Sequence, residues 1–126
     1  MKPLITIILI TILIIAAGCI TLYALNSESA RLNGSLSLLE QDIENQDWKT
    51  AEKKLEEFHR RWDKISGIWS MLIDHNEIDS IELALAQLGS YVKSKEKTEA
   101  LAQISALEKL IRHIPEKESP SLKNVF

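Results

Sequence analysis

Eight apolar residues in the middle of the chain recur in steps of three and four. They include all three tryptophans, and they are Trp48, Ala51, Leu55, Phe58, Trp62, Ile65, Trp69 and Leu72. This is the a/d pattern of one apolar helix face, held over about four heptads. A helix over 47–74 would be roughly 42 Å long at about 1.5 Å per residue, and it must bury such a face against other helices. The pattern therefore predicts the core of a helical bundle.

The N-terminal segment 4–25 carries no charge and consists mainly of Ile, Leu and Ala. As a helix it would span about 33 Å, which is enough to cross a hydrocarbon core of about 30 Å. A cleaved signal peptide usually has a shorter apolar core of about 7–15 residues. We therefore expect an uncleaved transmembrane anchor over 4–25, with residues 1–3 on one side of the membrane and a domain over 26–126 on the other.

Lipidation is the alternative for this segment. Ala16-Ala17-Gly18-Cys19 resembles a bacterial lipobox, in which cleavage before Cys19 would leave a diacylated cysteine. Two features favour the uncleaved anchor: Ala16 stands where Leu is usual, and the residues after Cys19 remain apolar. Cys19 is then an ordinary apolar residue, and as the single cysteine it allows no disulfide within the chain.

Positive charge near the ends of the anchor predicts its orientation. Lys2 and the amino terminus flank one end, whereas Arg31 near the other end is accompanied by Glu28. The positive-inside rule then places the N-terminus in the cytoplasm. The expected location is the cell membrane, crossed once, with the domain outside the cytoplasm.

Three further segments with helical periodicity surround the central one. We expect helices over 28–44, 77–93 and 97–114, stopped at Pro115 and followed by a tail over 115–126. The linkers are short, so neighbouring helices should run antiparallel, and Asp47 is placed to cap the central helix. The prediction is an all-α fold: an N-terminal transmembrane helix followed by a small antiparallel bundle of about four helices.

The domain also contains a weak internal similarity. Aligning Trp48 with Lys97 matches Ala51 to Ala100, Leu55 to Ile104 and Phe58 to Leu107. Helical-hairpin repeats of the tetratricopeptide kind show patterns like this, but stable solenoids need three or more repeats. A repeat-like hairpin arrangement therefore stays as the alternative to a simple bundle.

Charge and motifs narrow the function classes. The chain has 15 basic and 18 acidic residues, so it lacks the basic excess that phosphate binding requires, and nucleic acid is not an expected partner. The sequence contains no Gly-rich phosphate loop, no G-x-S-x-G, no H-E-x-x-H and no paired cysteines. We expect no enzymatic activity and no cofactor. The charged outer side of the central helix is typical of a solvated face.

The most suggestive polar cluster lies over 74–79. His75 and Asp79 are four residues apart, so a helix would place them on one face, and Asp74 and Glu77 add oxygen ligands. These four residues make a small ligand-binding or metal-binding sensor the alternative function. The simpler interpretation is a helix start, in which Asp74 or Asn76 is the cap and the acids complement the helix dipole.

Several segments together resemble an uncharacterised bacterial family of short proteins with an N-terminal anchor. They are Trp48 with Ala51, Trp62, the run 68–79, the run 114–118 and the ending 122–126. The resemblance implies an uncleaved anchor and a bacterial envelope setting, and it offers no catalytic residues. It also raises the interest of the 74–79 cluster and of the C-terminal residues Asn124, Val125 and Phe126.

We therefore expect an extracytoplasmic helical module that acts in protein–protein interaction or as an accessory subunit of a membrane complex. The implied partners are the lipid bilayer and another membrane or envelope protein, with self-association left open. The candidate interaction residues are Trp69, Asp74, His75, Asn124, Val125 and Phe126.

Overall fold

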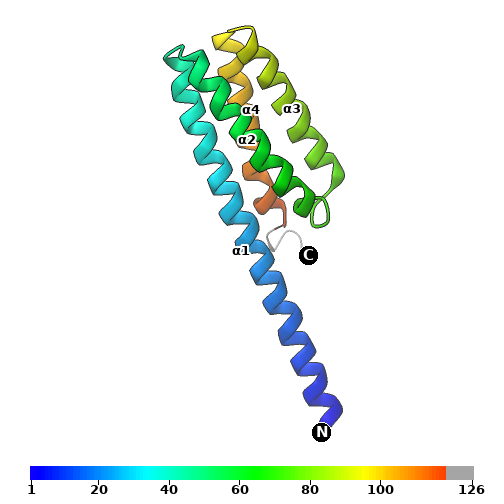
Figure 1. The fold of residues 1–126 in the computed structure, drawn as a ribbon. Helices are drawn as coiled ribbons and strands as arrows, with labels where there is room; N and C mark the ends of the chain where they lie inside the picture. The colour runs from blue at the N-terminus through cyan, green and yellow to red at the C-terminus, as the bar shows by residue number, and fades with distance from the viewer. Residues whose placement is uncertain (119–126) are drawn as a thin grey trace.

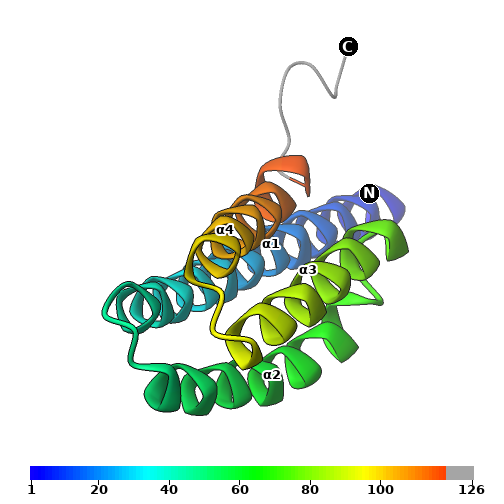
Figure 2. The same cartoon turned by 90° about the horizontal axis from the view of Figure 1, so that it is seen from above.

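The computed structural model describes residues 1–118, which form four α-helices. The helices are α1 (Lys2–Glu44), α2 (Trp48–Trp69), α3 (His75–Lys93) and α4 (Lys97–Glu118). They run alternately up and down (Figure 1), each packs against its neighbours in sequence, and α1 closes the ring against α4 (Figure 2). The all-α fold, with a long apolar N-terminal helix and an antiparallel bundle, is confirmed.

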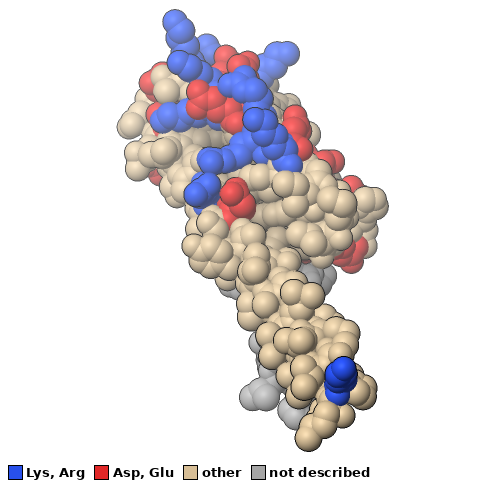
Figure 3. Space-filling model, turned by 60° about the horizontal axis from the view of Figure 1, so that its bottom comes forward, with Lys and Arg blue, Asp and Glu red and all other residues tan. Residues whose placement is uncertain are grey.

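Helix α1 has two halves with different surroundings. Its N-terminal half projects beyond the bundle as a shaft (Figure 1), and in Figure 3 this shaft lacks acidic residues and carries a basic residue near its tip. It is the one helix within residues 1–118 that is long and apolar enough to be a candidate membrane span. Its C-terminal half joins the bundle, and buried positions begin at Leu25. The helix expected over 28–44 is thus the direct continuation of the uncharged segment 4–25.

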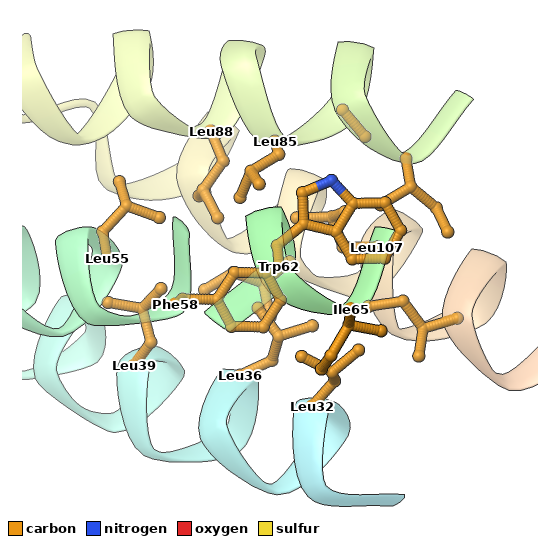
Figure 4. Close-up of a cluster of buried hydrophobic side chains, with 14 of the residues drawn as sticks. Leu32, Leu36, Leu39, Leu55, Phe58, Trp62, Ile65, Leu85, Leu88 and Leu107 are labelled. Carbon is orange, nitrogen blue, oxygen red and sulfur yellow. The ribbon is translucent and has the colours of Figure 1, made fainter. Parts of the chain in front are cut away.

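The bundle core is built from the heptad positions of all four helices (Figure 4). The predicted central stripe is buried at Ala51, Leu55, Phe58, Trp62, Ile65 and Trp69. In Figure 4, Leu32, Leu36 and Leu39 from α1 meet Phe58 and Trp62 from α2, while Leu85 and Leu88 approach from α3 and Leu107 from α4. The tryptophan-bearing helix is therefore one wall of a shared core.

The prediction was wrong at the end of the central stripe. Helix α2 ends at Trp69 and not at 74, and Leu72 is 46% exposed although it was expected in the core. After Ser70 the Met71 and Leu72 amides donate to carbonyls three residues back instead of four, so a heptad count no longer gives the direction of the side chains. Ile73, whose amide donates to the Trp69 carbonyl, turns inward instead. At the other end of the stripe, Trp48 is half-buried against the core.

Two nearly identical turns close the bundle at the end away from the shaft. Gln46 follows α1 with φ 57° and Lys95 follows α3 with φ 58°, 49 residues later. The next amide in each turn, from Asp47 or Glu96, donates to the carbonyl five residues back at 2.9 Å. Both turns are therefore Schellman motifs, in which a left-handed residue ends one helix before the next begins.

The same 49-residue shift relates the buried positions of the two hairpins. Each pair below is buried in both hairpins: Leu32 and Ile81, Leu36 and Leu85, Leu39 and Leu88, Ile43 and Val92, Ala51 and Ala100, Leu55 and Ile104, Phe58 and Leu107, Trp62 and Ile111, Ile65 and Ile114. The weak similarity in the sequence thus extends over both helices of each hairpin. The bundle consists of two matching αα-hairpins that bury their apolar faces against each other.

Pro115 does not stop the last helix, contrary to the prediction. Helix α4 continues through it to Glu118. A proline inside a helix lacks the N–H that would bond to the carbonyl four residues earlier, here that of Ile111. The hydroxyl of buried Ser29 on α1 donates to this carbonyl at 2.9 Å. A side chain from a neighbouring helix therefore satisfies the acceptor that Pro115 leaves free.

Candidate interaction surfaces on the bundle

The junction between α2 and α3 carries most of the residues that the sequence singled out. Asp74 is the N-cap of α3, and its carboxylate accepts a hydrogen bond from the Asn76 amide at 3.1 Å. Asp74 therefore performs the predicted capping role, and α3 begins at His75, two residues before the expected start. Asp47 likewise caps α2, accepting from the Thr50 amide at 3.3 Å.

The 74–79 cluster does not converge on one point. Asp74, His75 and Asp79 are exposed and Glu77 is half-buried in the first turn of α3. Within residues 1–118, no group of three or more His, Cys, Asp or Glu side chains is placed to hold a metal ion. The geometry supports a capped helix start with acidic residues near the positive end of the dipole.

Trp69 belongs to the core and not to the surface. Its side chain is 3% exposed and packs edge-on against Trp62, with ring centroids 5.9 Å apart. Such pairs contribute about 0.5–1.5 kcal/mol beyond their buried area. Replacing Trp69 would therefore damage the fold, and it is not a suitable probe of partner binding. The exposed apolar residues at this end of the bundle are its neighbours Ile68, Met71 and Leu72.

A groove of about 880 Å³ lies between α1 and α2. Its apolar part includes Leu38, which is 52% exposed, together with the edges of Phe58 and Ile65. The basic residues on its walls are Lys54, Arg60, Arg61 and Lys64. Charged residues of both signs cover the bundle surface above the shaft in Figure 3. We call the groove lined by these residues of α1 and α2 the α1–α2 groove.

The charges of the α1–α2 groove are only partly paired. Lys54 contacts Asp42 of α1 at 2.7 Å, and Glu28 contacts Arg31 at 3.5 Å. Within the described residues, the three other cations of the groove form no ion pair closer than 4 Å, and the unpaired acids lining it are Glu57 and Asp63. The groove therefore presents exposed guanidinium and ammonium groups beside an apolar floor.

A separate polar contact joins α1 to α4. The Asn33 side-chain amide donates to the Glu108 carbonyl at 3.4 Å. Burial raises the pKa of the Glu108 carboxyl and nearby Glu40 raises it further, while Arg112 opposes the shift. One carboxylate oxygen of Glu108 is buried without a hydrogen-bond partner. This group lies between two packed helices and not in the α1–α2 groove, so it is a feature of the helix interface.

The comparison with protein families decides the classification. The family described as "Domain of unknown function (DUF4363)" matches residues 19–125. The chain belongs to this family. The DUF4363 match begins within the apolar half of α1 and includes the whole bundle, with both the groove and the α2–α3 junction. No curated protein and no solved structure matches the chain.

Membership in DUF4363 assigns no ligand or reaction, so the exposed surfaces of the bundle are the guide to function. Of the predicted interaction residues, Asp74 and His75 are exposed, Trp69 is in the core, and Asn124, Val125 and Phe126 lie outside the described residues. Cys19, the candidate lipidation site, is exposed on the shaft of α1. The α1–α2 groove was missed. Its residues at 57, 60, 61 and 64 follow helical spacing, but only the position of α1 beside them creates the groove.

Proposed function

We propose that this chain is a single-pass membrane protein whose bundle lies outside the cytoplasm and acts as an interaction module or accessory subunit. The exposed apolar shaft of α1 supports membrane anchoring, because no other part of the described chain covers it. Lys2 at its start, opposite the mixed charges Glu28 and Arg31, supports a cytoplasmic N-terminus. The proposed role is binding, without catalysis.

The observation that carries the interaction role is the α1–α2 groove. An exposed leucine beside unpaired cations suits a partner segment that offers apolar and acidic side chains together. Arg60 and Arg61 can each form two parallel hydrogen bonds with a carboxylate, which adds geometric specificity to the charge attraction. The proposed partner is therefore an acidic, amphipathic segment of another membrane or envelope protein.

Crosslinking of the full chain in its own membrane tests this partner. A photoreactive amino acid at position 38 is expected to give a covalent adduct, and the same probe at Leu83 on α3, which is 63% exposed, is the matched control. Reversing two charges of the groove, Arg60→Glu with Arg61→Glu, is expected to abolish the adduct. Lys49→Glu, at an exposed cation of α2 that does not line the groove, should preserve it.

The outcomes separate the alternatives. An adduct twice the mass of the chain would identify a second copy as the partner. Equal labelling from positions 38 and 83, or an adduct that survives the charge reversal, would refute the groove as the binding site.

The topology of the chain is tested separately. A reporter that works only outside the cytoplasm, fused after Phe126, should be active. Activity of a cytoplasmic reporter at that position would overturn the orientation.

A further inference from the structure

Three apolar side chains are exposed together where α2 turns into α3. Met71 is 80% exposed, Ile68 is 59% exposed, and Leu72, expected in the core, is also open to solvent. They lie in the last turn of α2 and the two positions after Ser70, so they form one patch. We call it the turn patch. Contiguous exposed apolar patches are typical of sites that contact a protein or a membrane.

The register of α2 against α1 gives the height of the turn patch. The contact between Lys54 and Asp42 places these two residues at one level. From Lys54 to Trp69, α2 runs back toward the shaft by about 22 Å at about 1.5 Å per residue. The same distance along α1 from Asp42 leads to about residue 27, at the end of the uncharged segment. Figure 1 shows the α2–α3 turn at this height beside α1.

Helix α1 is continuous, so this height is fixed relative to the anchor. The bundle cannot lift away from the bilayer without breaking helical hydrogen bonds of α1 near Leu25, where the uncharged segment ends and bundle packing begins. The headgroup region adds about 5–7 Å on each side of the hydrocarbon core. Tyr23, exposed on the shaft near this level, is of the residue type enriched at membrane interfaces.

From this geometry we propose that the turn patch inserts into the interfacial region of the lipid bilayer and holds the bundle against the membrane surface. The inference rests on the proposed anchoring of segment 4–25. Charges of both signs flank the patch, with Lys64 on α2 and Asp74 and Asp79 on α3. The contact is therefore apolar, and it does not depend on anionic lipid. This role differs from that of the α1–α2 groove, which lies on the side of the bundle.

The test uses the full chain reconstituted in phosphatidylcholine vesicles, with an environment-sensitive fluorophore on one introduced cysteine. All variants carry Cys19→Ala, so that the label has a single site. Met71→Cys probes the patch, and Ile68→Cys probes it independently. Leu83→Cys is the control, because Leu83 is similarly exposed but lies about 12 Å farther along α3 from its start. Leu13→Cys reports the anchor.

A spin-labelled lipid with its nitroxide near the headgroup is expected to quench most of the emission from positions 68 and 71 and to leave position 83 unquenched. Emission from 68 and 71 should also lie at shorter wavelength than emission from 83. Quenching should be unchanged when phosphatidylglycerol is added. If the probe at 13 emits as in a bilayer but the probes at 68 and 71 show water-like emission and no quenching, the proposed role of the patch alone is overturned. Water-like emission from the probe at 13 would overturn the anchor and the patch together. Quenching at 68 and 71 that requires phosphatidylglycerol would overturn the apolar contact.

Discussion

Replacing Ser29 with alanine is expected to destabilise the bundle, because its hydroxyl satisfies the carbonyl that Pro115 leaves free. Ser29 is buried and donates to the Ile111 carbonyl at 2.9 Å across the α1–α4 interface. A buried acceptor left without a partner costs about 1–3 kcal/mol. Alanine recovers about 0.5 kcal/mol through its higher helix propensity. The expected loss in the free energy of unfolding is therefore about 0.5–2.5 kcal/mol.

The matched control is Ser35→Ala on the same helix. The Ser35 hydroxyl donates to the Arg31 carbonyl of its own helix at 3.1 Å. That carbonyl keeps its helical amide partner when the hydroxyl is removed, so this substitution should leave stability unchanged or raise it by about 0.5 kcal/mol. Urea unfolding of the full chain in detergent, followed by tryptophan emission, measures both variants, since Trp62 and Trp69 are buried in the core.

A double-mutant cycle isolates the mechanism. Pro115→Ala restores an N–H that can bond to the Ile111 carbonyl, so Ser29→Ala should cost almost nothing in that background. Pro115→Ala also removes the packing of the buried proline ring, but this loss is the same in the single and the double variant and cancels in the cycle. The expected coupling energy is about 1–3 kcal/mol, the cost of the unsatisfied acceptor. Equal losses from Ser29→Ala with and without Pro115 would refute the explanation.

Three other predictions concern the turns, the buried acid and metal ions. Gln46→Gly and Lys95→Gly should each stabilise the bundle by about 0.5–1 kcal/mol, because glycine relieves the left-handed conformation at some cost in chain entropy; a lower urea midpoint for either would contradict this. Burial raises the pKa of Glu108, so the folded state holds this proton more tightly than the unfolded chain. The contribution of the proton to stability is present below the ordinary pKa of 4.5 and is lost as the pH rises through the folded pKa. Glu108→Gln should therefore be more stable than the parent at pH 7 and lose that advantage at pH 4. A difference in stability that does not change with pH, or the same pattern for exposed Glu56→Gln, would exclude titration of Glu108 as the cause. Zinc or calcium should leave the melting temperature of the full chain unchanged, and a rise abolished by His75→Ala would support the metal-sensor alternative.

The period of the apolar residues was enough to predict the helices and most of the core. Six of the eight central positions are buried, because a regular helix converts spacing in sequence into direction in space. The prediction was wrong where the chain leaves that regularity. Leu72 follows the heptad count, but the turn after Trp69 rotates the backbone and Ile73 takes the buried position.

Features that depend on two helices at once could not be read from the sequence. Pro115 was expected to end its helix because a proline lacks the N–H that would bond to the carbonyl four residues earlier, and the sequence does not show which other group bonds to that carbonyl. Its partner Ser29 lies 86 residues earlier in the chain, on another helix. The α1–α2 groove was missed for the same reason, since Leu38 and Arg61 share a surface only through the packing of α1 beside α2.

Comparison of the two hairpins indicates why the groove belongs to the first. The 49-residue shift places Gln87 and Gln103 at the positions of Leu38 and Lys54, and the Gln103 amide donates to the Gln87 carbonyl oxygen at 2.7 Å, joining α3 to α4. In the first hairpin, an exposed leucine and a lysine paired with Asp42 occupy these positions. The hairpins thus share the positions of their buried residues and differ on the surface between their helices. A core that needs only matching apolar faces leaves those surface positions free to differ, and this difference places the groove of the proposed partner on the α1–α2 hairpin.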